Sequence, residues 1–319
     1  MFKDYENEPS PVSPYPLFLR PVLCRKIWGG QKLSALFGKE AAAAGDGNDD
    51  PVGESWELSV RPDGMSVIEN GPLAGMTLGE ALGCTLREDG SDFPLLVKFI
   101  DAGDRLSVQV HPNKTELWYI VSAEEGSELT LGLTDESAAE AESDPGLFKK
   151  RLFGGKEVEA ALKRVRVKAG EFYLLPSGLI HAIGSGILIA EIQQNSNVTF
   201  RLYDYGRDRP LSVGEAADAV IAQKVFSAAP SLEQTKGQSK IDSGFFTAEA
   251  IVLSPAEKRT FRAEEGFVHL LCTGGGGILR GEKEYPIRAG QSCLLPRGCP
   301  DLELGTEHGI SLIASAVQK

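Results

Sequence analysis

The chain has 319 residues, of which 33 are Lys or Arg and 45 are Asp or Glu, so its formal net charge is −12. Hydrophobic residues make up 42% and charged residues 24%, as in ordinary globular proteins. The acidic excess argues against a nucleic-acid-binding protein, because phosphate binding rests on clustered Lys and Arg. No run of about 18 apolar residues occurs, which argues against a membrane-spanning helix. The length predicts two compact units or one large β unit.

The N-terminal segment Met1–Ser10 is polar and acidic, so it does not predict a secretory signal peptide, which is basic and then apolar. Five cysteines are scattered along the chain without a Cys-x-x-Cys pair, a pattern that fits free thiols better than a disulfide framework. We therefore expect a cytoplasmic protein with neither nucleic acid nor membrane among its partners. The cysteines are Cys24, Cys84, Cys272, Cys293 and Cys299.

Short apolar segments separated by Gly and Pro predict many short strands, the pattern of a β-sandwich or barrel. In chain order these segments are Trp56–Val60, Leu95–Phe99, Leu106–His111, Leu117–Val121, Phe172–Leu175, Leu188–Ile192 and Val268–Cys272.

Helical signals are fewer. Thr77-Leu-Gly-Glu80 and Ser212-Val-Gly-Glu215 have the form of a capping box at a helix start, and the second opens an Ala-rich amphipathic segment, Glu215–Val225. Ser137–Glu142 and Lys156–Val165 are rich in Ala, Glu and Lys, which predicts two more helices.

The chain contains an internal repeat. Lys168–His181 and Arg288–Asp301 share Ala-Gly, Leu-Leu-Pro and a later Gly at equal spacing. In both copies a turn glycine precedes an apolar strand and a Pro-x-Gly turn follows it, which is the repeat unit of a cupin-like β-jelly roll. The turn of such a unit often carries a metal-binding histidine on the next strand. His181 takes that position in the first copy and Asp301 in the second, where no partner ligands are near.

We therefore expect a mainly β, cupin-like double jelly roll with one metal-binding barrel, one degenerate barrel and a few added helices. The catalytic, metal-binding domain is expected over residues 1–226 and the degenerate β domain over residues 240–319. Between them the polar segment Ser227–Ser243 has little apolar periodicity and predicts a linker. Two unrelated strand–turn–strand units with similar turns are the alternative to a repeat.

A polar strand face lies in the first half of the chain. Ser107, Gln109 and His111 alternate with Val108 and Val110, so in a strand the polar residues point to one face and the valines to the other. If the polar face looks into a barrel, its groups need partners. A metal ion would satisfy them directly.

The next segment adds a carboxylate to this face. Lys114 and Glu116 share a face of the following predicted strand, so His111, His181, Glu116 and Gln109 together offer two imidazoles, one carboxylate and one amide oxygen. Such a mixed set suits Zn²⁺ and also Fe²⁺, Mn²⁺ or Co²⁺, because geometry and availability separate these metals more than ligand type does.

The chain holds four histidines. One histidine alone on an apolar strand is more often a hydrogen-bonded core residue than a ligand, and we keep that interpretation for His269 and His308. For His111 and His181 the joint pattern favours metal binding.

Several blocks together resemble the short bacterial form of type I mannose-6-phosphate isomerase, a member of the cupin superfamily. They keep the order of that family over roughly residues 16 to 210, whereas the rest of the chain matches loosely. Any one block is weak, but the joined set is specific. The blocks are Trp28-Gly-Gly30, Gly53–Ser59, Phe99–Pro112, Lys114–Tyr119, Gly178–Gly184 and Gln194–Tyr205.

The resemblance implies an aldose–ketose isomerase, an intramolecular oxidoreductase that interconverts D-mannose 6-phosphate and D-fructose 6-phosphate through a cis-enediol. The expected partner is this phosphosugar, and no obligate protein partner is implied. The resemblance also implies one Zn²⁺ per chain, held by His111, Glu116 and His181, with Gln109 as a fourth ligand.

The family pattern places an essential arginine at Arg201 and a pocket lysine at Lys114, and we assign both as catalytic. The alternative for Arg201 is a structural ion pair with Asp204 or Glu191, and for Lys114 a solvated side chain. Arg207 is a second candidate for binding the phosphate.

Ser107 is a pocket candidate by its strand face. The general base stays open among Lys114, Glu54, Glu57, Glu191 and a metal-bound water. Glu54 and Glu57 are three residues apart and cannot share a strand face, so at most one of them lines the pocket, and we favour Glu54.

One segment departs from the family pattern. Only Asn113 separates His111-Pro112 from Lys114, where family members usually carry an insertion that flanks the pocket. Two other functions remain. Another metal-dependent cupin enzyme, such as an oxygenase, would usually keep a His-x-His pair, but Gln109 takes the first position here. A non-catalytic phosphosugar-binding cupin fits the degenerate second barrel but not the intact ligand set with Lys114 and Arg201.

Overall fold

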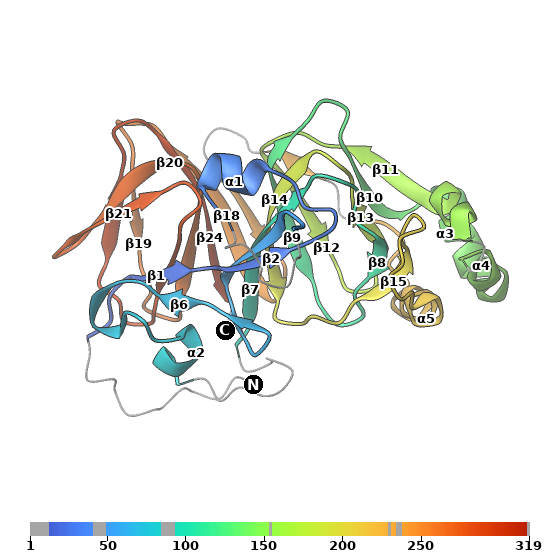
Figure 1. Ribbon diagram of the computed structural model, residues 1–319, viewed down its shortest axis with the longest axis horizontal. Coiled ribbons are helices and arrows are strands. Elements are labelled where there is room, and N and C mark those ends of the chain that lie inside the picture. The colour runs from blue at the N-terminus through green and yellow to red at the C-terminus, as the bar shows by residue number, and fades with distance from the viewer. Residues whose placement is uncertain are drawn as a thin grey trace. The chain divides into compact units, whose positions relative to one another are not determined.

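The computed structural model of the protein describes residues 13–40, 49–83, 93–152, 155–228, 231–233 and 238–317. The chain forms antiparallel sheets with a few short helices, which confirms the predicted mainly β class (Figure 1). Met1–Ser10 and Cys84 lie outside the described residues.

The chain forms two compact units. Unit 1 comprises Met1–Val22, Trp56–Leu96 and Thr235–Lys319, and unit 2 comprises Leu23–Ser55 and Val97–Gln234. The functional division expected over residues 1–226 and 240–319 stays a prediction.

Unit 1 is built on one antiparallel sheet whose main path runs β17-β18-β24-β20-β22-β1-β6, with β19, β21 and β23 paired beside it. The bounds are β1 Leu17–Arg20, β6 Val67–Ile68, β17 Gln238–Asp242, β18 Phe246–Leu253, β19 Lys258–Phe261, β20 Val268–Arg280, β21 Glu284–Arg288, β22 Ser292–Leu295, β23 Leu302–Gly305 and β24 Ile310–Val317. A short ribbon pairs β4, Val60–Arg61, with β5, Gly64–Met65. The unit also contains the 3-10 turn η1, Gly71–Leu73, and α2, Leu78–Ala81.

Unit 2 carries a five-stranded sheet, in the order β11-β10-β13-β8-β15, and most of a seven-stranded sheet, in the order β16-β12-β9-β14-β7-β3-β2. The five strands are β8 Val108–Val110, β10 Glu128–Leu133, β11 Leu162–Arg166, β13 His181–Ile183 and β15 Phe200–Tyr203. The seven are β2 Val22–Arg25, β3 Val52–Leu58, β7 Leu95–Ala102, β9 Glu116–Ala123, β12 Glu171–Leu175, β14 Ile187–Gln194 and β16 Leu232–Glu233. The division between the units falls inside β2, β3 and β7.

Apolar side chains from both sheets of unit 2 form one core. Trp118, Ile120 and Tyr173 of the seven-stranded sheet pack in the same cluster as Leu129 and Leu131 of the five-stranded sheet. Their strands alternate apolar and polar positions, so the period of two predicts which side chains face this core.

Helices cover part of the other face of the five-stranded sheet (Figure 1). Val108 and Val110 of β8 pack in a second core with Phe148 of α4 and Val220 of α5. The strand-face prediction is therefore confirmed for the two valines. The helices of unit 2 are α1 Lys32–Phe37, α3 Asp135–Ser143, α4 Pro145–Leu152, the 3-10 segment η2 Gly155–Ala161, and α5 Val213–Gln223.

The two capping boxes differ in outcome. Thr77 accepts a hydrogen bond from the backbone of Glu80, and the Glu80 side chain accepts one from the backbone of Thr77, as predicted. Ser212 does precede α5, but its side chain makes no capping hydrogen bond, and the helix begins at Val213 rather than Glu215.

Two segment predictions were wrong. Lys156–Val165 is not a single helix, because its second half becomes β11 and pairs with β10 while Leu162 enters the core. The expected linker Ser227–Ser243 contains β16 and β17, which pair with β12 and β18. In both segments cross-strand pairing outweighs local propensity.

The repeat is visible in the turns of both copies. Gly170 and Gly178 of the first copy and Gly290 and Gly298 of the second all have φ between +78° and +92°, a region that favours glycine. The turns are also closed alike, since Leu179 N donates to the carbonyl of Pro176 as Cys299 N donates to that of Pro296. Asp301 pairs with Arg262 on the surface instead of facing ligands.

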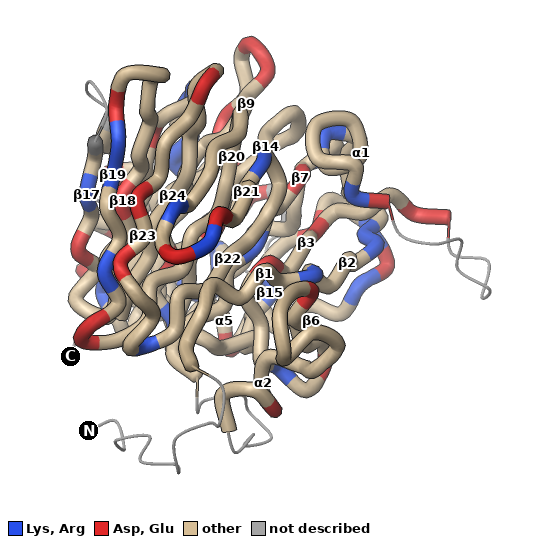
Figure 2. The backbone as a smooth tube through the Cα atoms, turned by 90° about the vertical axis from the view of Figure 1, so that its left-hand side faces the viewer, with Lys and Arg blue, Asp and Glu red and all other residues tan. Residues whose placement is uncertain are grey.

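Figure 2 shows Lys and Arg interspersed with Asp and Glu along the described backbone. Within the described ranges, none of the helices has both the length and the apolar character that crossing a membrane requires.

His269 lies in the core of unit 1 with 0% exposure. Its Nε2 is 2.7 Å from Ser292 Oγ, and Ser292 Oγ donates to the carbonyl of Glu57. The Ser292 proton is therefore given to Glu57, so the His269 Nε2 donates to Ser292. The prediction of a hydrogen-bonded core histidine is confirmed for His269.

Burial lowers the pKa of His269 from 6.5 to about 3. Between these values the unfolded chain binds a proton that the folded chain does not, so this residue destabilises the fold as the pH falls below 6.5. We predict that His269→Gln flattens the pH dependence of the unfolding free energy by about 1.4 kcal/mol per pH unit near pH 5, although it lowers stability at pH 7 by about 1–3 kcal/mol. Denaturant titrations between pH 4 and pH 8 measure both effects.

His308 of the same unit is exposed, so the interpretation as a core histidine is wrong for this residue. His308→Gln therefore provides the matched control. If the unfolding free energy of His269→Gln depended on pH as steeply as that of the wild type, the lowered pKa of His269 would be contradicted.

Candidate metal centre and active site

The pairing of three strands places three polar residues in a row on the inner face of the five-stranded sheet. His181 of β13 lies opposite Gln109 of β8, and Arg201 of β15 lies opposite Gln109 from the other side. Residues that face each other across antiparallel strands project to the same side of a sheet. The sequence places these residues far apart, and the register brings them together.

The seven-stranded sheet contributes a second polar row. Glu116 of β9 lies opposite Gln193 of β14, and Trp118 lies opposite Glu191 two residues further along both strands. All four side chains therefore project to one face, the same face from which Trp118 enters the core shared by both sheets.

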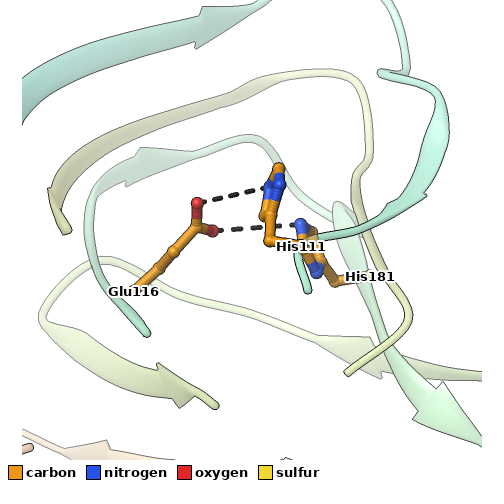
Figure 3. A group of neighbouring side chains, drawn as sticks. All are labelled: His111, Glu116 and His181. Carbon is orange, nitrogen blue, oxygen red and sulfur yellow. Dashed lines mark ion pairs between the residues drawn. The ribbon is translucent and has the colours of Figure 1, made fainter. Parts of the chain in front are cut away.

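His111, Glu116 and His181 meet in a compact buried group (Figure 3). His111 Nε2 is 3.3 Å from Glu116 Oε1, and His181 Nε2 is 3.8 Å from Glu116 Oε2. The three residues are 2–4% exposed. Ligand atoms around a tetrahedral zinc lie about 3.4 Å apart, so the spacing is close to that of a first coordination shell.

Backbone carbonyls fix both imidazoles in the form that binds a metal. His111 Nδ1 is 2.8 Å from the carbonyl oxygen of Val198, and His181 Nδ1 is 2.9 Å from that of Leu179. A carbonyl oxygen only accepts, so each Nδ1 carries the proton and each Nε2 presents a lone pair to Glu116. Outer partners of this kind orient metal-binding histidines.

Gln109 completes the group. Its amide Nε2 is 3.3 Å from His111 Nε2 and 3.4 Å from His181 Nε2, between the two lone pairs. Rotating the amide by half a turn exchanges this nitrogen for the oxygen, which is a metal ligand. The four residues therefore fit the donor set that the sequence predicts for a metal.

Burial lowers the pKa of His111 well below 6.5, and the ammonium group of Lys114 lowers it further. Burial also lowers the pKa of His181. Burial alone would raise the pKa of Glu116, but the ammonium group of Lys114 acts against it, and that pKa lies far below its usual value. Two neutral imidazoles and one carboxylate result.

The surroundings of the Glu116 carboxylate fit a site for a cation. Lys114 Nζ is 2.6 Å from Oε1, whereas Oε2 is buried and accepts no hydrogen bond from the described residues. The Lys114 contact is an ion pair between two buried groups. A buried carboxylate with an open oxygen beside two lone pairs fits a bound metal ion.

Lys114 is buried, with 4% exposure, so it is not a solvated lysine. Its ammonium group also donates to Gln193 Oε1 at 2.9 Å. Gln193 in turn donates to the carbonyl oxygens of Gln194 and Ser196, which fixes the amide so that its oxygen faces Lys114.

A second buried charge pair lies in the same sheet. Glu191 accepts a hydrogen bond from Trp118 Nε1 at 2.9 Å, and its Oε2 is 3.6 Å from Lys98 Nζ. Lys98 also lies 3.8 Å from Glu54, which pairs with Lys26 at 3.1 Å.

Burial raises the pKa of Glu191 to about 7, and the nearby Glu116 carboxylate acts in the same direction. Burial opposes the charged form of Lys98, but Glu54 and Glu191 outweigh it and raise its pKa. The two buried groups therefore differ, since Glu191 holds its proton more tightly than an exposed glutamate does.

Gln109, His111, Glu116 and His181 are called the metal group below. Arg201 lies opposite Gln109 of this group and has no carboxylate partner among the described residues. Its Nε is 3.3 Å from Ser107 Oγ, and its Nη1 donates to the carbonyl of Pro210 at 2.8 Å. Burial and the neighbouring Arg209 lower its pKa. The structural ion pair considered for Arg201 is absent, because Asp204 binds Arg207 and Arg209 instead.

The structure places Arg207 away from the metal group. Its guanidinium pairs with Asp104 and Asp204 and donates to the carbonyl of Arg105 at 2.8 Å. Its substrate role stays a prediction.

The short segment between His111 and Glu116 makes a side-chain contact with the chain that follows β14. Ser196 Oγ donates to Asn113 Oδ1 at 2.9 Å. The segment Ser196–Val198, which supplies the carbonyl that orients His111, thus also contacts the position where an insertion is missing.

Sequence reasoning missed Lys98 and Gln193. Lys98 was detectable, because it is the one charged residue within the otherwise apolar Leu95–Ile100, and a charge in a buried strand is rarely left without a function or a partner. Gln193 gave no such signal, since its role follows from the register of β14 on β9.

Comparison with known proteins identifies the family of this chain. Residues 17–135 match the model of the type I phosphomannose isomerase catalytic domain. A mannose-6-phosphate isomerase of Streptococcus mutans is 36% identical over 92% of this chain and 98% of its own length. The mannose-6-phosphate isomerase ManA of Bacillus subtilis is 32% identical over 91% and 95%.

Solved structures of mannose 6-phosphate isomerases share the fold of this chain. The crystal structure of the mannose 6-phosphate isomerase from Bacillus subtilis has a TM-score of 0.72 and 29% identity, and covers 95% of this chain and 100% of that one. A zinc-bound mannose 6-phosphate isomerase has a TM-score of 0.70 at 14% identity, with coverages of 95% and 100%, which shows the shared fold. On the strength of these relatives, the chain belongs to the type I phosphomannose isomerase family.

Proposed function

We propose that the protein interconverts D-mannose 6-phosphate and D-fructose 6-phosphate by an aldose–ketose proton transfer through a cis-enediol. The observation that carries this function is the buried convergence of Gln109, His111, Glu116 and His181 next to the charged residues Lys114, Glu191 and Arg201. The relatives named above act as mannose-6-phosphate isomerases.

A metal is proposed at this convergence. His111, Glu116 and His181 would hold one Zn²⁺ per chain, with Gln109 as the fourth ligand. A related fold has been solved with zinc bound, and the mixed nitrogen and oxygen donors suit that ion. When bound, the metal supplies a Lewis acid that stabilises negative charge on the sugar oxygens.

Arg201 is proposed to stabilise the anionic substrate. Its guanidinium keeps one contact to a hydroxyl and one to a carbonyl, so its positive charge is not neutralised by a carboxylate. Arginine presents paired N–H groups that match phosphate and enediolate oxygens. Ser107, 3.3 Å from Arg201 Nε, would hold the guanidinium in place.

Glu191 is the proposed general base. Its Oε1 is fixed by Trp118, and its Oε2 accepts no hydrogen bond from the described residues. A base works best when its pKa lies near the working pH, and burial brings that of Glu191 to about 7. Glu54, favoured from the sequence, pairs with two lysines instead.

Lys114 is proposed to compensate the negative charge of Glu116 next to the metal. Its ammonium group lies 2.6 Å from Glu116 and keeps that carboxylate ionised. It is also close enough to the donor set to contact a bound sugar oxygen.

The proposed catalytic domain is residues 1–226, since all of the proposed site residues lie there. We also propose a cytoplasmic location, supported by the free thiols of Cys272, Cys293 and Cys299, which fit a reducing compartment.

The function is tested by a coupled assay of the zinc-loaded protein on mannose 6-phosphate, beside an EDTA-treated sample. We expect fructose 6-phosphate from the loaded protein alone, and recovery of turnover when Zn²⁺ is added back. We expect His181→Ala to lose bound metal, measured by elemental analysis after dialysis, together with activity. The exposed His308→Ala is the control.

Full metal retention in His181→Ala would remove that residue from the ligand set. Stoichiometric metal without turnover on mannose 6-phosphate would reject the proposed reaction.

Arg201→Gln should keep the metal and the folded state but reduce kcat/KM for mannose 6-phosphate by roughly 100-fold, because one charged donor to the developing anion is lost. Arg201→Lys keeps the charge without the paired N–H groups and should recover only part of the rate. Steady-state kinetics with metal analysis measures this. Near wild-type kcat/KM in Arg201→Gln would return Arg201 to a structural role.

Glu191→Gln should reduce kcat by roughly 100-fold or more, because the amide cannot accept the proton, while its oxygen can still accept from Trp118. In the wild type, kcat/KM should fall as the pH drops below about 7, where Glu191 becomes protonated. Glu54→Gln is the matched variant, because Glu54 and Glu191 both pair with Lys98. If Glu54→Gln abolishes turnover and Glu191→Gln does not, the base is Glu54.

A further inference from the structure

A pocket of about 190 Å³ opens on the face of the five-stranded sheet opposite the metal group. Thr130 lies opposite both Ala182 and Arg164 across neighbouring strands, so these three share a face, and all three line the pocket. His181 lies opposite Leu131 and shares the other, inner face. The pocket and the metal group are therefore separated by the thickness of β13.

Helices leave this part of the face open. The helical core packs against Val110, Leu133 and Leu202, whereas the pocket lies where β10 begins and β13 ends, at Glu128 and Ile183. In Figure 1, α3, α4 and α5 lie to the right of β8 and β15.

Arginine side chains surround one tyrosine in this pocket. The Arg105 guanidinium stacks 3.7 Å from the centre of the Tyr205 ring, and the Arg207 guanidinium lies 5.8 Å from it. Arg164 lines the pocket from β11. Arg207 is neutralised by Asp104 and Asp204.

The other two arginines share one carboxylate. Glu159 Oε2 is 2.8 Å from Arg164 and 3.9 Å from Arg105. Two positive charges thus face one negative charge. The Arg105 and Arg164 side chains are 48% and 54% exposed, so the uncompensated positive charge can bind an anionic ligand from solution. The Glu128 carboxylate in the pocket wall lies 3.8 Å from Arg166, outside the pocket.

Tyr205 is held in a strained backbone conformation. Its φ is +56°, which is uncommon for a large aromatic residue, and such conformations gather at binding sites. The conformation places the ring against Arg105. The Tyr205 hydroxyl forms no hydrogen bond within the part of the chain that the structure describes, so it is free to donate.

We propose that the pocket between Arg105, Arg164 and Tyr205 is an accessory binding site for a small metabolite that carries a phosphate or carboxylate group. The anionic group lies between the two guanidinium groups and takes the place of Glu159 on Arg164. The Tyr205 and Thr130 hydroxyls donate to the same group. This site does not depend on the reaction proposed for the inner face.

The test is calorimetric titration of the zinc-loaded full chain with inorganic phosphate and, separately, with malonate. Arg201→Gln serves as the background, so that phosphate binding at the proposed catalytic pocket does not contribute. Tighter binding of phosphate assigns a phosphate ester as the ligand class, and tighter binding of malonate assigns a carboxylate. Binding of neither probe overturns the proposal.

Two substitutions in this background act in opposite directions. Arg164→Gln removes a charged donor and should weaken binding by about tenfold. Glu159→Gln removes the competing carboxylate and should tighten binding several-fold. Lys163→Gln, an exposed neighbour on β11 that does not line the pocket, removes the same charge as Arg164→Gln and should change the affinity less than twofold.

Equal weakening by Arg164→Gln and Lys163→Gln would show attraction to surface charge in general and overturn the site. Unchanged or weaker binding in Glu159→Gln would overturn it as well. Thermal unfolding checks that each variant is folded, and Glu159→Gln decides the matter even if Arg164→Gln does not fold.

Discussion

The buried Glu116 carboxylate is the constraint on which the rest of the site depends. Its charge lies out of water beside two imidazole nitrogens that present lone pairs, and one of its oxygens accepts no hydrogen bond from the described residues. Acceptors alone cannot stabilise one another in a buried site. Lys114 lies on one side of the carboxylate, and the lone pairs on the other side fit a bound cation.

The remaining charges follow from that constraint. Lys98 and Glu191 form a second pair in the same sheet, and Glu54 pairs with Lys98 and Lys26. A buried charge is tolerated when it has an opposite partner, so the row alternates in sign from Lys26 to Glu191. This alternation leaves Glu191 between a carboxylate that raises its pKa and a lysine that lowers it.

One strand, β13, separates two different environments. His181 faces the inner core with its Nδ1 held by the carbonyl of Leu179, while the next residue, Ala182, faces outward. The inner side offers lone pairs and carboxylates, and the outer side offers arginines around Tyr205. The buried histidine of unit 1, His269 of β20, shows the contrast, because it contacts serine hydroxyls and has no carboxylate among its described hydrogen-bond partners.

The sequence alone predicted which residues meet as the donor set. A period of two put Gln109 and His111 on one strand face, and the turn of the repeat singled out His181, because these signals depend only on spacing along the chain. It also predicted the mainly β class and the helix over Ser137–Glu142, within α3. It failed for Lys156–Val165, where helix-forming residues are drawn into a strand by pairing with β10.

Only the tertiary structure decided which distant residues meet. The register of β14 on β9 brings Glu191 and Gln193 to the face of Glu116, and the packing of β3 and β7 in one sheet brings Glu54 near Lys98. It also separated Arg201, which stays beside Ser107, from Arg207, which Asp104 and Asp204 hold elsewhere. Local spacing fixes the face of a residue within its own strand, but cross-strand register and the pairing of charges depend on the whole fold.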